Sequence, residues 1–96
     1  MAEVRSGVDQ LDARIVDMLA LRFGYMRAAA RIKPDRGQVR DEDRKAEVIA
    51  NARMRAEEAG LPGDLVATLW ETLVEGSIAY EMKHWDERRA EADRSA

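Results

Sequence analysis

Apolar residues recur every three or four positions along three stretches of the chain, a spacing that predicts α-helices and gives no sign of a strand. In the first stretch they fall at Val8, Leu11, Ile15, Met18 or Leu19, Met26 and Ala29. Pro34 and Gly37 break the pattern, so we expect a first helix over about residues 6–32, with Ser6 and Asp9 as a capping box at its start.

Two more helices are expected, each with a chemically marked start. The second runs from Asp41 to Gly60, because Asp favours the N-cap and glycine the position after the last turn. The third runs from Asp64 to Trp85 and leads into a polar tail, residues 86–96, that we expect to fray. The inward positions are Val48, Ile49, Ala52, Ala56 and Ala59 in the second helix and Leu65, Val66, Leu69, Trp70, Leu73, Val74, Ile78, Met82 and Trp85 in the third. The predicted fold class is all-α, with a long, a short and a long helix in a single domain spanning residues 1–96.

The first helix is too long for a monomeric globule of this size. At 1.5 Å per residue, about 27 residues make a helix of about 40 Å. A compact domain of 96 residues has a radius of gyration of only about 12 to 13 Å. Two shorter helices cannot cover the whole apolar stripe, and so large an exposed remainder is unusual in a monomer. We therefore expect an intertwined helical homodimer.

Composition and charge argue against several classes of function. The chain has no Cys and a single His, so we expect neither a disulfide framework nor a metal site. Its net charge of -3 provides no overall basic field for nucleic acid. The start lacks the apolar run of a signal peptide, and no uncharged stretch is long enough to span a bilayer. We expect a cytoplasmic protein without nucleic-acid or membrane partners.

Two cations interrupt the apolar face of the first helix. Beyond Met18 the stripe leads to Arg22 and Lys33, which share one face about 16 Å apart along a continuous helix. Both side chains can reach toward a small anion between them. Alternatively, Arg22 pairs with Asp17 or Glu81, and Lys33 merely interacts with the helix dipole.

A hydroxyl and a carboxyl interrupt the third helix in the same way. Ser77 and Glu81 are four residues apart on the face that Val66 and Leu73 define. Either both point inward together, or both sit at a boundary that solvent reaches.

Two further cations complete a candidate anion site. Arg44 falls in the first turn of the second helix behind Asp41, near amides that attract anions. Arg5 lies 17 residues before Arg22 and projects about 100° away from the Arg22 face. It cannot easily serve a pocket in its own chain, but it can serve the partner's. Arg5, Arg22, Lys33 and Arg44 can thus surround one small polyanion.

The order of these residues resembles the all-helical chorismate mutase family. The resemblance rests on Arg5, "LDARIVDMLALR" ending at Arg22, Lys33, "VRDEDR" ending at Arg44, and "SIAYE" from Ser77 to Glu81, and it covers the chain from about Arg5 to Trp85. It implies a three-helix subunit and an intertwined homodimer with two active sites. It also implies an isomerase of aromatic amino acid biosynthesis that rearranges chorismate to prephenate without cofactor or metal.

The resemblance assigns roles to the residues nearest the reacting atoms. Arg22 and the partner subunit's Arg5 would bind the two carboxylates of chorismate, and Lys33 would reach the ether oxygen and a carboxylate. Glu81 would face the ether oxygen, where it can donate a hydrogen bond only if protonated; the family more often has Gln at this position.

The remaining site residues follow from the same resemblance. Ser77 would lie near a carboxylate, Arg44 would line the site, and the backbone near Asp41 would meet the ring hydroxyl. One position departs from the family: in the bacterial mutases an acidic residue usually follows the position of Arg44 and holds this hydroxyl, whereas here it is Lys45.

Other readings remain open beside the mutase. "AAARIK", "AYEMKHW" and the 11-residue step from Lys33 to Arg44 are similar to the isochorismate pyruvate lyases, siblings on the same fold that make salicylate and pyruvate. "VRDEDR" resembles the mutases better. An amino-substituted chorismate is a third candidate substrate. The alternative without catalysis is a helical dimerisation module whose inward charges only pair with one another.

Overall fold

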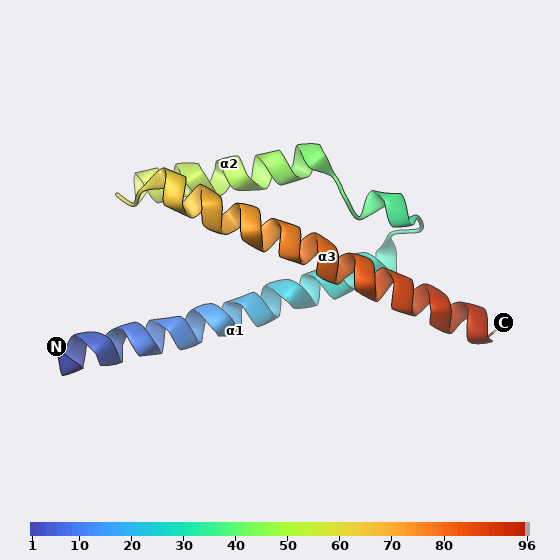
Figure 1. Cartoon of the computed structure of the whole chain (residues 1–96), viewed down its shortest axis with the longest axis horizontal. Coiled ribbons are helices and arrows are strands. Elements are labelled where there is room, and N and C mark those ends of the chain that lie inside the picture. The colour runs from blue at the N-terminus through green and yellow to red at the C-terminus, as the bar shows by residue number, and fades with distance from the viewer. Residues whose placement is uncertain (96) are drawn as a thin grey trace.

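The computed structural model describes residues 1–95, which form three α-helices and one short 3-10 helix (Figure 1). The α-helices are α1 (Ala2–Ile32), α2 (Glu42–Glu58) and α3 (Gly63–Ser95), and the 3-10 helix η1 (Arg36–Gln38) lies between α1 and α2. The all-helical fold with a long, a short and a long helix is confirmed for these residues.

Helix α1 begins at Ala2 rather than near Ser6. The Met1 carbonyl accepts the Arg5 N–H at 3.0 Å, which closes the first turn. Ser6 therefore lies inside the helix, where its hydroxyl accepts a hydrogen bond from the Gln10 side chain at 3.4 Å. The predicted capping box with Asp9 is wrong, because an alanine and a glutamate at positions 2 and 3 already favour a helical first turn.

Pro34 ends α1, as predicted. A residue before proline is disfavoured in helical conformation, and Lys33 accordingly adopts an extended one with φ -71° and ψ 123°. Asp35 and Gln38 then cap η1 reciprocally. The connection from Lys33 to Asp41 is thus an ordered turn, and it brings the chain to the start of α2.

Both ends of α2 follow the sequence signals. The Asp41 side chain accepts a hydrogen bond from the Arg44 backbone N–H at 3.0 Å, which confirms Asp41 as the N-cap. At the other end Gly60 has φ +77°, a conformation that a side chain disfavours. The Leu61 N–H donates to the Ala56 carbonyl at 2.8 Å across this glycine, the hydrogen bond of a Schellman motif.

Helix α3 differs from the prediction at both ends. It begins at Gly63, so Asp64 lies in the first turn, and the Asp64 carboxylate forms an ion pair with Arg53 of α2 instead of capping the helix. The tail after Trp85 was expected to fray, yet α3 continues to Ser95. Alanine, glutamate and arginine dominate this segment and favour helix without tertiary support.

Helix α3 organises the packing. It packs against both α1 and α2, whereas within residues 1–95 the backbones of α1 and α2 do not approach each other closely. In Figure 1 the second half of α1 crosses α3, and α2 runs beside the first half of α3. The buried apolar residues are correspondingly few and small, namely Ala30, Val39, Ala56, Ala67 and Val74. The radius of gyration is 16.9 Å, well above the 12 to 13 Å or so of a compact globule of this length.

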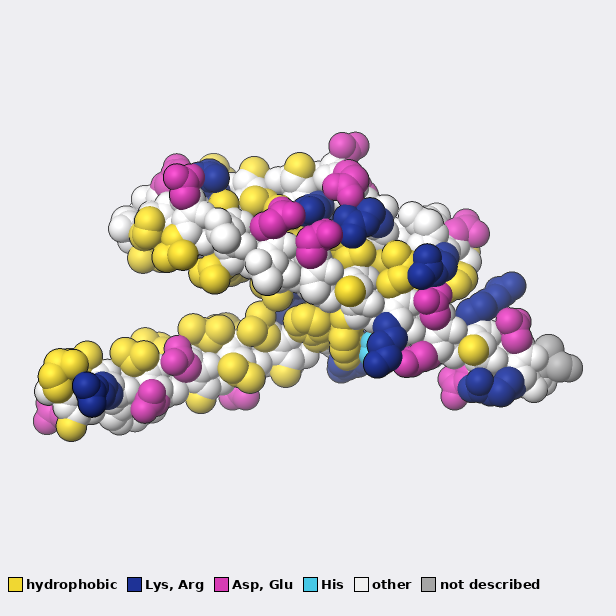
Figure 2. All heavy atoms as spheres, viewed as in Figure 1, with side chains coloured by type: hydrophobic (Ala, Val, Ile, Leu, Met, Phe, Trp, Pro, Cys, Tyr) yellow, Lys and Arg dark blue, Asp and Glu magenta, His cyan; other side chains and the backbone are white. Residues whose placement is uncertain are grey.

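The first half of α1 has no cover in the chain. Every residue from 1 to 18 is exposed. We call the face formed by Val4, Val8, Leu11, Ile15 and Met18 the apolar stripe; these side chains are between 49% and 60% exposed. Figure 2 shows hydrophobic side chains along the α1 arm and along the edge of the α2–α3 arm that faces it. Within residues 1–95, no helix is both long and apolar enough to cross a bilayer.

Candidate active site

One cavity gathers the polar residues that the sequence singled out. It has a volume of about 400 Å³ and lies among the second half of α1, the connection around η1, the start of α2 and the middle of α3. Its lining includes Arg22, Lys33, Asp41, Arg44, Ser77 and Glu81. This volume is within the range of small-molecule sites.

Arg22 and Ser77 form the first polar pair of the cavity. Arg22 donates from Nη1 to Ser77 Oγ at 2.6 Å, and Ser77 donates in turn to the Leu73 carbonyl at 2.7 Å. Arg22 therefore takes neither acidic partner considered from the sequence. Partial burial lowers the pKa of the Arg22 guanidinium from its ordinary value, but an arginine stays charged in a protein. A guanidinium has five N–H donors, so others remain for an anion.

Lys33 and Glu81 form the second pair. Lys33 Nζ lies 2.7 Å from Glu81 Oε2, and Glu81 is only 4% exposed. Ser77, four residues earlier on α3, is 3% exposed, so the two residues point inward and the boundary alternative is wrong. The Lys33 backbone is fixed separately, because Trp85 Nε1 donates to its carbonyl at 3.0 Å.

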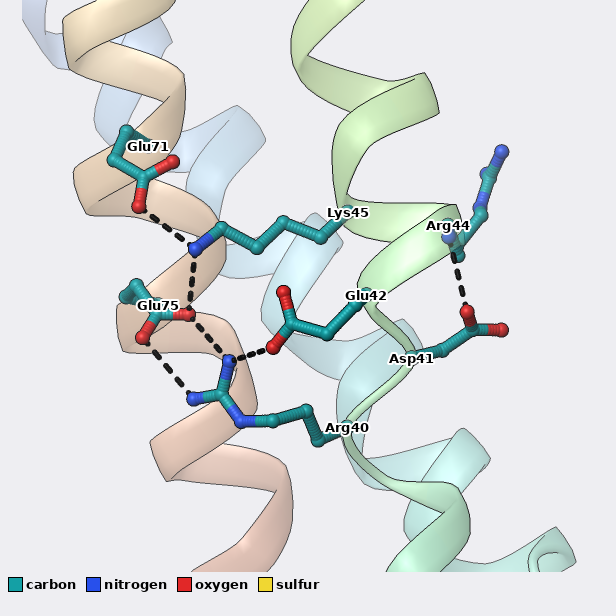
Figure 3. Close-up of polar contacts among 7 residues, drawn as sticks. All are labelled: Arg40, Asp41, Glu42, Arg44, Lys45, Glu71 and Glu75. Atoms are coloured by element: carbon teal, nitrogen blue, oxygen red, sulfur yellow. Dashed lines mark hydrogen bonds and ion pairs between the residues drawn. The ribbon is translucent and has the colours of Figure 1, made fainter.

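Asp41 and Arg44 stand at the α2 side of the cavity. The Asp41 carboxylate accepts the backbone N–H of Arg44, and the Arg44 guanidinium binds Glu47 on the same helix at 2.5 Å. Figure 3 shows the Arg44 side chain pointing away from the ion pairs that Arg40 and Lys45 form with α3. Both residues are exposed at the rim of the cavity, where a ligand can reach them.

Lys45, the residue that departs from the family pattern, is held by α3. Its Nζ lies 2.7 Å from Glu71 and 3.2 Å from Glu75 (Figure 3). The hydrogen bond with Glu71 is the main cause that raises the pKa of Lys45 above its ordinary value. Lys45 also lines the cavity, so it contributes a cation where the resemblance implies an acidic residue.

Arg5 is the predicted site residue that the structure places elsewhere. It is exposed near the start of α1 and lies 17 residues before Arg22 on one continuous helix, a separation of about 25 Å. It therefore does not reach the cavity of its own chain.

Part of the cavity wall comes from residues that were not predicted to belong to the site. Gln38 and Val39 line it from η1 and the residue after it, in a segment that was interpreted only as a break between helices. The apolar wall is completed by Met26, Ala29, Val48, Val74 and Ile78, all of which belong to the apolar pattern that predicted the helices. For Gln38 the sequence offers no signal, because it is the turn of η1 that brings this residue to the edge of the cavity.

The cavity suits a small anion. Among the described residues its lining has four cationic side chains (Arg22, Lys33, Arg44 and Lys45) and two acidic ones (Asp41 and Glu81). Within residues 1–95 no group of three potential metal ligands occurs. The arrangement can bind carboxylates through charge-assisted hydrogen bonds and place Lys33 and Glu81 as hydrogen-bonding groups beside a reacting oxygen.

Comparison with known proteins agrees with the predicted resemblance. Residues 4–82 match the family model of chorismate mutase type II. Over 92 residues the chain is 30% identical to an isochorismate pyruvate lyase of Pseudomonas aeruginosa, an alignment that covers 96% of this chain and 91% of the relative.

Proposed function

Because this chain belongs to the chorismate mutase type II family, we propose that it rearranges chorismate to prephenate in the cavity of α1, α2 and α3. The observation that carries the proposal is the pairing of Lys33 with buried Glu81 beside Arg22 and Ser77 in one cavity of net positive charge. In this reaction the ether C–O bond breaks while a C–C bond forms between the enolpyruvyl methylene and the ring. No proton or electron enters or leaves, so the protein needs neither a base nor a nucleophile.

The cations would restrain the substrate. Arg22 lines the cavity and has N–H donors besides the one that binds Ser77, and a bidentate contact with one substrate carboxylate would fix the enolpyruvyl arm over the ring. Ser77, which already accepts from Arg22, would lie close to the same carboxylate. Arg44 would exchange its exposed contact with Glu47 for the ligand, and the backbone near Asp41 would meet the ring hydroxyl.

Lys33 and Glu81 would act on the ether oxygen, which gains negative charge as its bond to the ring breaks. Lys33 would donate one hydrogen bond to this oxygen and touch a carboxylate. Glu81 would donate a second from Oε1, as a protonated acid, because an ionised carboxylate beside a developing negative charge opposes the reaction. The charged groups that share the cavity with Glu81 are Arg22, Lys33, Asp41, Arg44 and Lys45.

A homodimer would complete the site. The apolar stripe is uncovered in the single chain, and a second copy would bury it. Arg5 is too far from the cavity of its own chain, so we propose that the partner subunit's Arg5 binds the second carboxylate. The four cations of the cavity lining support a dicarboxylate ligand.

Isochorismate pyruvate lyase activity is the second candidate. The relative from Pseudomonas aeruginosa supports it, because the alignment spans nearly the whole chain. In that reaction the same C–O bond breaks while a ring hydrogen moves to the enolpyruvyl methylene, giving salicylate and pyruvate. The demands on Arg22 and Lys33 are the same, so the position of the ring hydroxyl decides between the substrates. Lys45 lines the cavity beside Arg44, and its ammonium would repel the amino group of an amino-substituted chorismate.

A turnover assay with each substrate tests the proposal. The purified protein is incubated with chorismate, isochorismate and an amino-substituted chorismate, and prephenate, salicylate and the rearranged amino product are quantified. Prephenate formation that Arg22→Ala abolishes is the expected result. If the protein forms salicylate from isochorismate and no prephenate from chorismate, it is a lyase and the mutase proposal is wrong. If no substrate gives a product and a bicyclic transition-state analogue shows no saturable binding, the protein is a helical dimerisation module without catalysis.

A further inference from the structure

The connection between α1 and α2 is tied to α3 at three points. Trp85 Nε1 donates to the Lys33 carbonyl at 3.0 Å. Arg36 binds Asp86 with two hydrogen bonds, from Nε to Oδ1 at 2.8 Å and from Nη2 to Oδ2 at 3.2 Å. Arg40 binds Glu75 with two more, from Nη1 to Oε2 and from Nη2 to Oε1, each at 3.0 Å. Arg36 and Arg40, four residues apart, thus each bind a carboxylate of α3 through two hydrogen bonds.

Along α3, the acidic partners of these two arginines lie on either side of Ser77 and Glu81. Glu75 and Asp86 are 11 residues apart on α3, about 16 Å along the helix. Ser77 and Glu81, the two buried polar residues of the cavity, lie between them. The connection therefore spans the stretch of α3 that carries the site, and Gln38 and Val39 form part of the cavity wall midway.

We propose that residues 33–41, which we call the strap, are held over the cavity by the Arg36–Asp86 and Arg40–Glu75 clamps, and that Arg36 and Arg40 are positioning residues for catalysis. This inference rests on the proposed function, since it concerns the same cavity. Neither arginine lines the cavity. Each acts through its neighbour along the strap, Arg36 through Lys33 and Arg40 through Asp41.

The two clamps have different tasks because they hold different ends. Arg36–Asp86 and the adjacent Trp85 contact fix the end that carries Lys33, so they set where its ammonium can reach beside Glu81. Loss of this clamp changes kcat. Arg40–Glu75 fixes the end that leads into the Asp41 cap and the first turn of α2 (Figure 3). Loss of that clamp changes KM, because this end meets the bound ligand at the cavity rim.

The clamps are strong enough to position the strap but not to hold the fold. All four of their side chains are between 41% and 56% exposed, and exposed ion pairs contribute little to stability. The paired geometry adds direction to each contact, since an arginine fork and a carboxylate match in one plane. Removing one acid therefore shifts the strap while the packing of α3 against α1 and α2 remains.

The test compares Asp86→Asn and Glu75→Gln with two matched controls. Asp93→Asn removes an exposed carboxylate from the same helix, where it pairs with Arg89 at 3.8 Å and not with the strap. Glu71→Gln removes the 2.7 Å partner of Lys45 one turn before Glu75 and leaves Arg40 intact. Circular dichroism verifies that each variant is folded.

Trp85 reports on the strap without any substrate. In a Trp70→Phe background Trp85 is the remaining tryptophan, and its indole N–H is bonded to Lys33. Asp86→Asn should raise quenching of its fluorescence by acrylamide, and Asp93→Asn should not. With the substrate that the wild type turns over, Asp86→Asn should lower kcat by about two- to fivefold with little change in KM, and Glu75→Gln should raise KM by a similar factor. Reversing the charges of the first clamp, Arg36→Asp with Asp86→Arg, should restore kcat.

Two results would overturn the inference. One is quenching and kcat in Asp86→Asn equal to those in Asp93→Asn. The other is a KM in Glu75→Gln equal to that in Glu71→Gln. Failure of the proposed function is distinguishable, because a wild type that converts none of the substrates still gives the Trp85 comparison, and that comparison alone then decides whether the strap is clamped.

Discussion

Replacing Ile15 by Ser should weaken dimerisation, because Ile15 lies in the middle of the apolar stripe that the single chain leaves open. In the chain alone Ile15 is 49% exposed. Burying an aliphatic side chain completely is worth about 1.5 to 3 kcal/mol, so burying the exposed half is worth about 0.7 to 1.5 kcal/mol. A two-fold symmetric dimer contains the residue twice, and the loss per dimer is about 1.5 to 3 kcal/mol.

This free energy converts to a measurable change in affinity. At 1.4 kcal/mol per factor of ten, the dissociation constant of the dimer should rise by about 10- to 150-fold. Serine and isoleucine have similar helix propensities, so the effect does not come from the helix itself. Ala13→Ser is the matched control, since position 13 lies on the opposite side of α1 from the stripe.

Sedimentation velocity over a concentration series measures the dissociation constants directly. Thermal unfolding adds a second readout, because the midpoint of an obligate dimer rises with concentration. A wild type that sediments as a folded, active monomer at micromolar concentration would refute the reasoning, and so would an Ile15→Ser dimer as tight as the Ala13→Ser dimer. In either case another partner covers the stripe or none does.

Three further changes test the site. Arg22→Ala and Arg5→Ala should each remove most of the activity with the fold retained. Mixing the two variants should restore some activity, because one site of a mixed dimer then has both arginines. No recovery despite demonstrated subunit exchange would place Arg5 outside the partner's site. Glu81→Gln should preserve kcat/KM from about pH 5 to 9, since an amide donates at every pH, whereas Glu81→Ala should lose about a hundredfold; equal losses would show that the carboxyl has another role. Acidification should loosen the strap: hydrogen bonds from the clamp arginine hold the pKa of Asp86 below its ordinary value, so its stabilising contribution is complete above its unfolded-state pKa and is lost as the pH falls through the lower folded-state pKa. Quenching of Trp85 in the Trp70→Phe protein should then rise below about pH 4, and an unchanged signal in that range would contradict the clamp.

The helices were predictable because local chemistry sets their ends. Pro34 forces Lys33 out of the helix, the Asp41 side chain caps the next one, and Gly60 supplies the positive φ that ends it. The prediction failed where no local signal marks the end of a helix, as at the end of α3. The polar tail lacks the apolar periodicity of the rest of α3, so the sequence pattern gave no reason to extend the helix, although the composition of the tail favours helix to Ser95.

The site was predictable as a set of faces but not as a set of contacts. Arg22 and Lys33 share a face of α1, and Ser77 and Glu81 share a face of α3, so periodicity places them in one region. Which partner each cation takes depends on the height at which α1 crosses α3. The contact between Arg22 and Ser77 bridges 55 residues of sequence, and no local rule specifies such a crossing.

The strap residues were missed for a different reason. Arg36 and Arg40 lie among the residues that break one helix and start the next, where charged side chains usually face water. Their acidic partners lie on α3, 50 and 35 residues further along the chain. A bidentate contact at that separation requires the turn of η1, which the sequence pattern indicates only as an interruption.

Helix α1 runs without a break from the apolar stripe into the cavity, so one continuous helix carries both the stripe and the α1 residues of the site. Successive residues turn by about 100°, and the phase between Ile15 and Arg22 is therefore fixed by the number of residues between them. One residue inserted after Met18 would rotate Arg22 by about 100° relative to the stripe, whereas seven residues, close to two full turns, would rotate it by only about 20°. The length of this helix is thus far less free to vary than its composition, and insertions or deletions there must come close to whole numbers of turns, about 7 or 11 residues for example, to leave both surfaces in register.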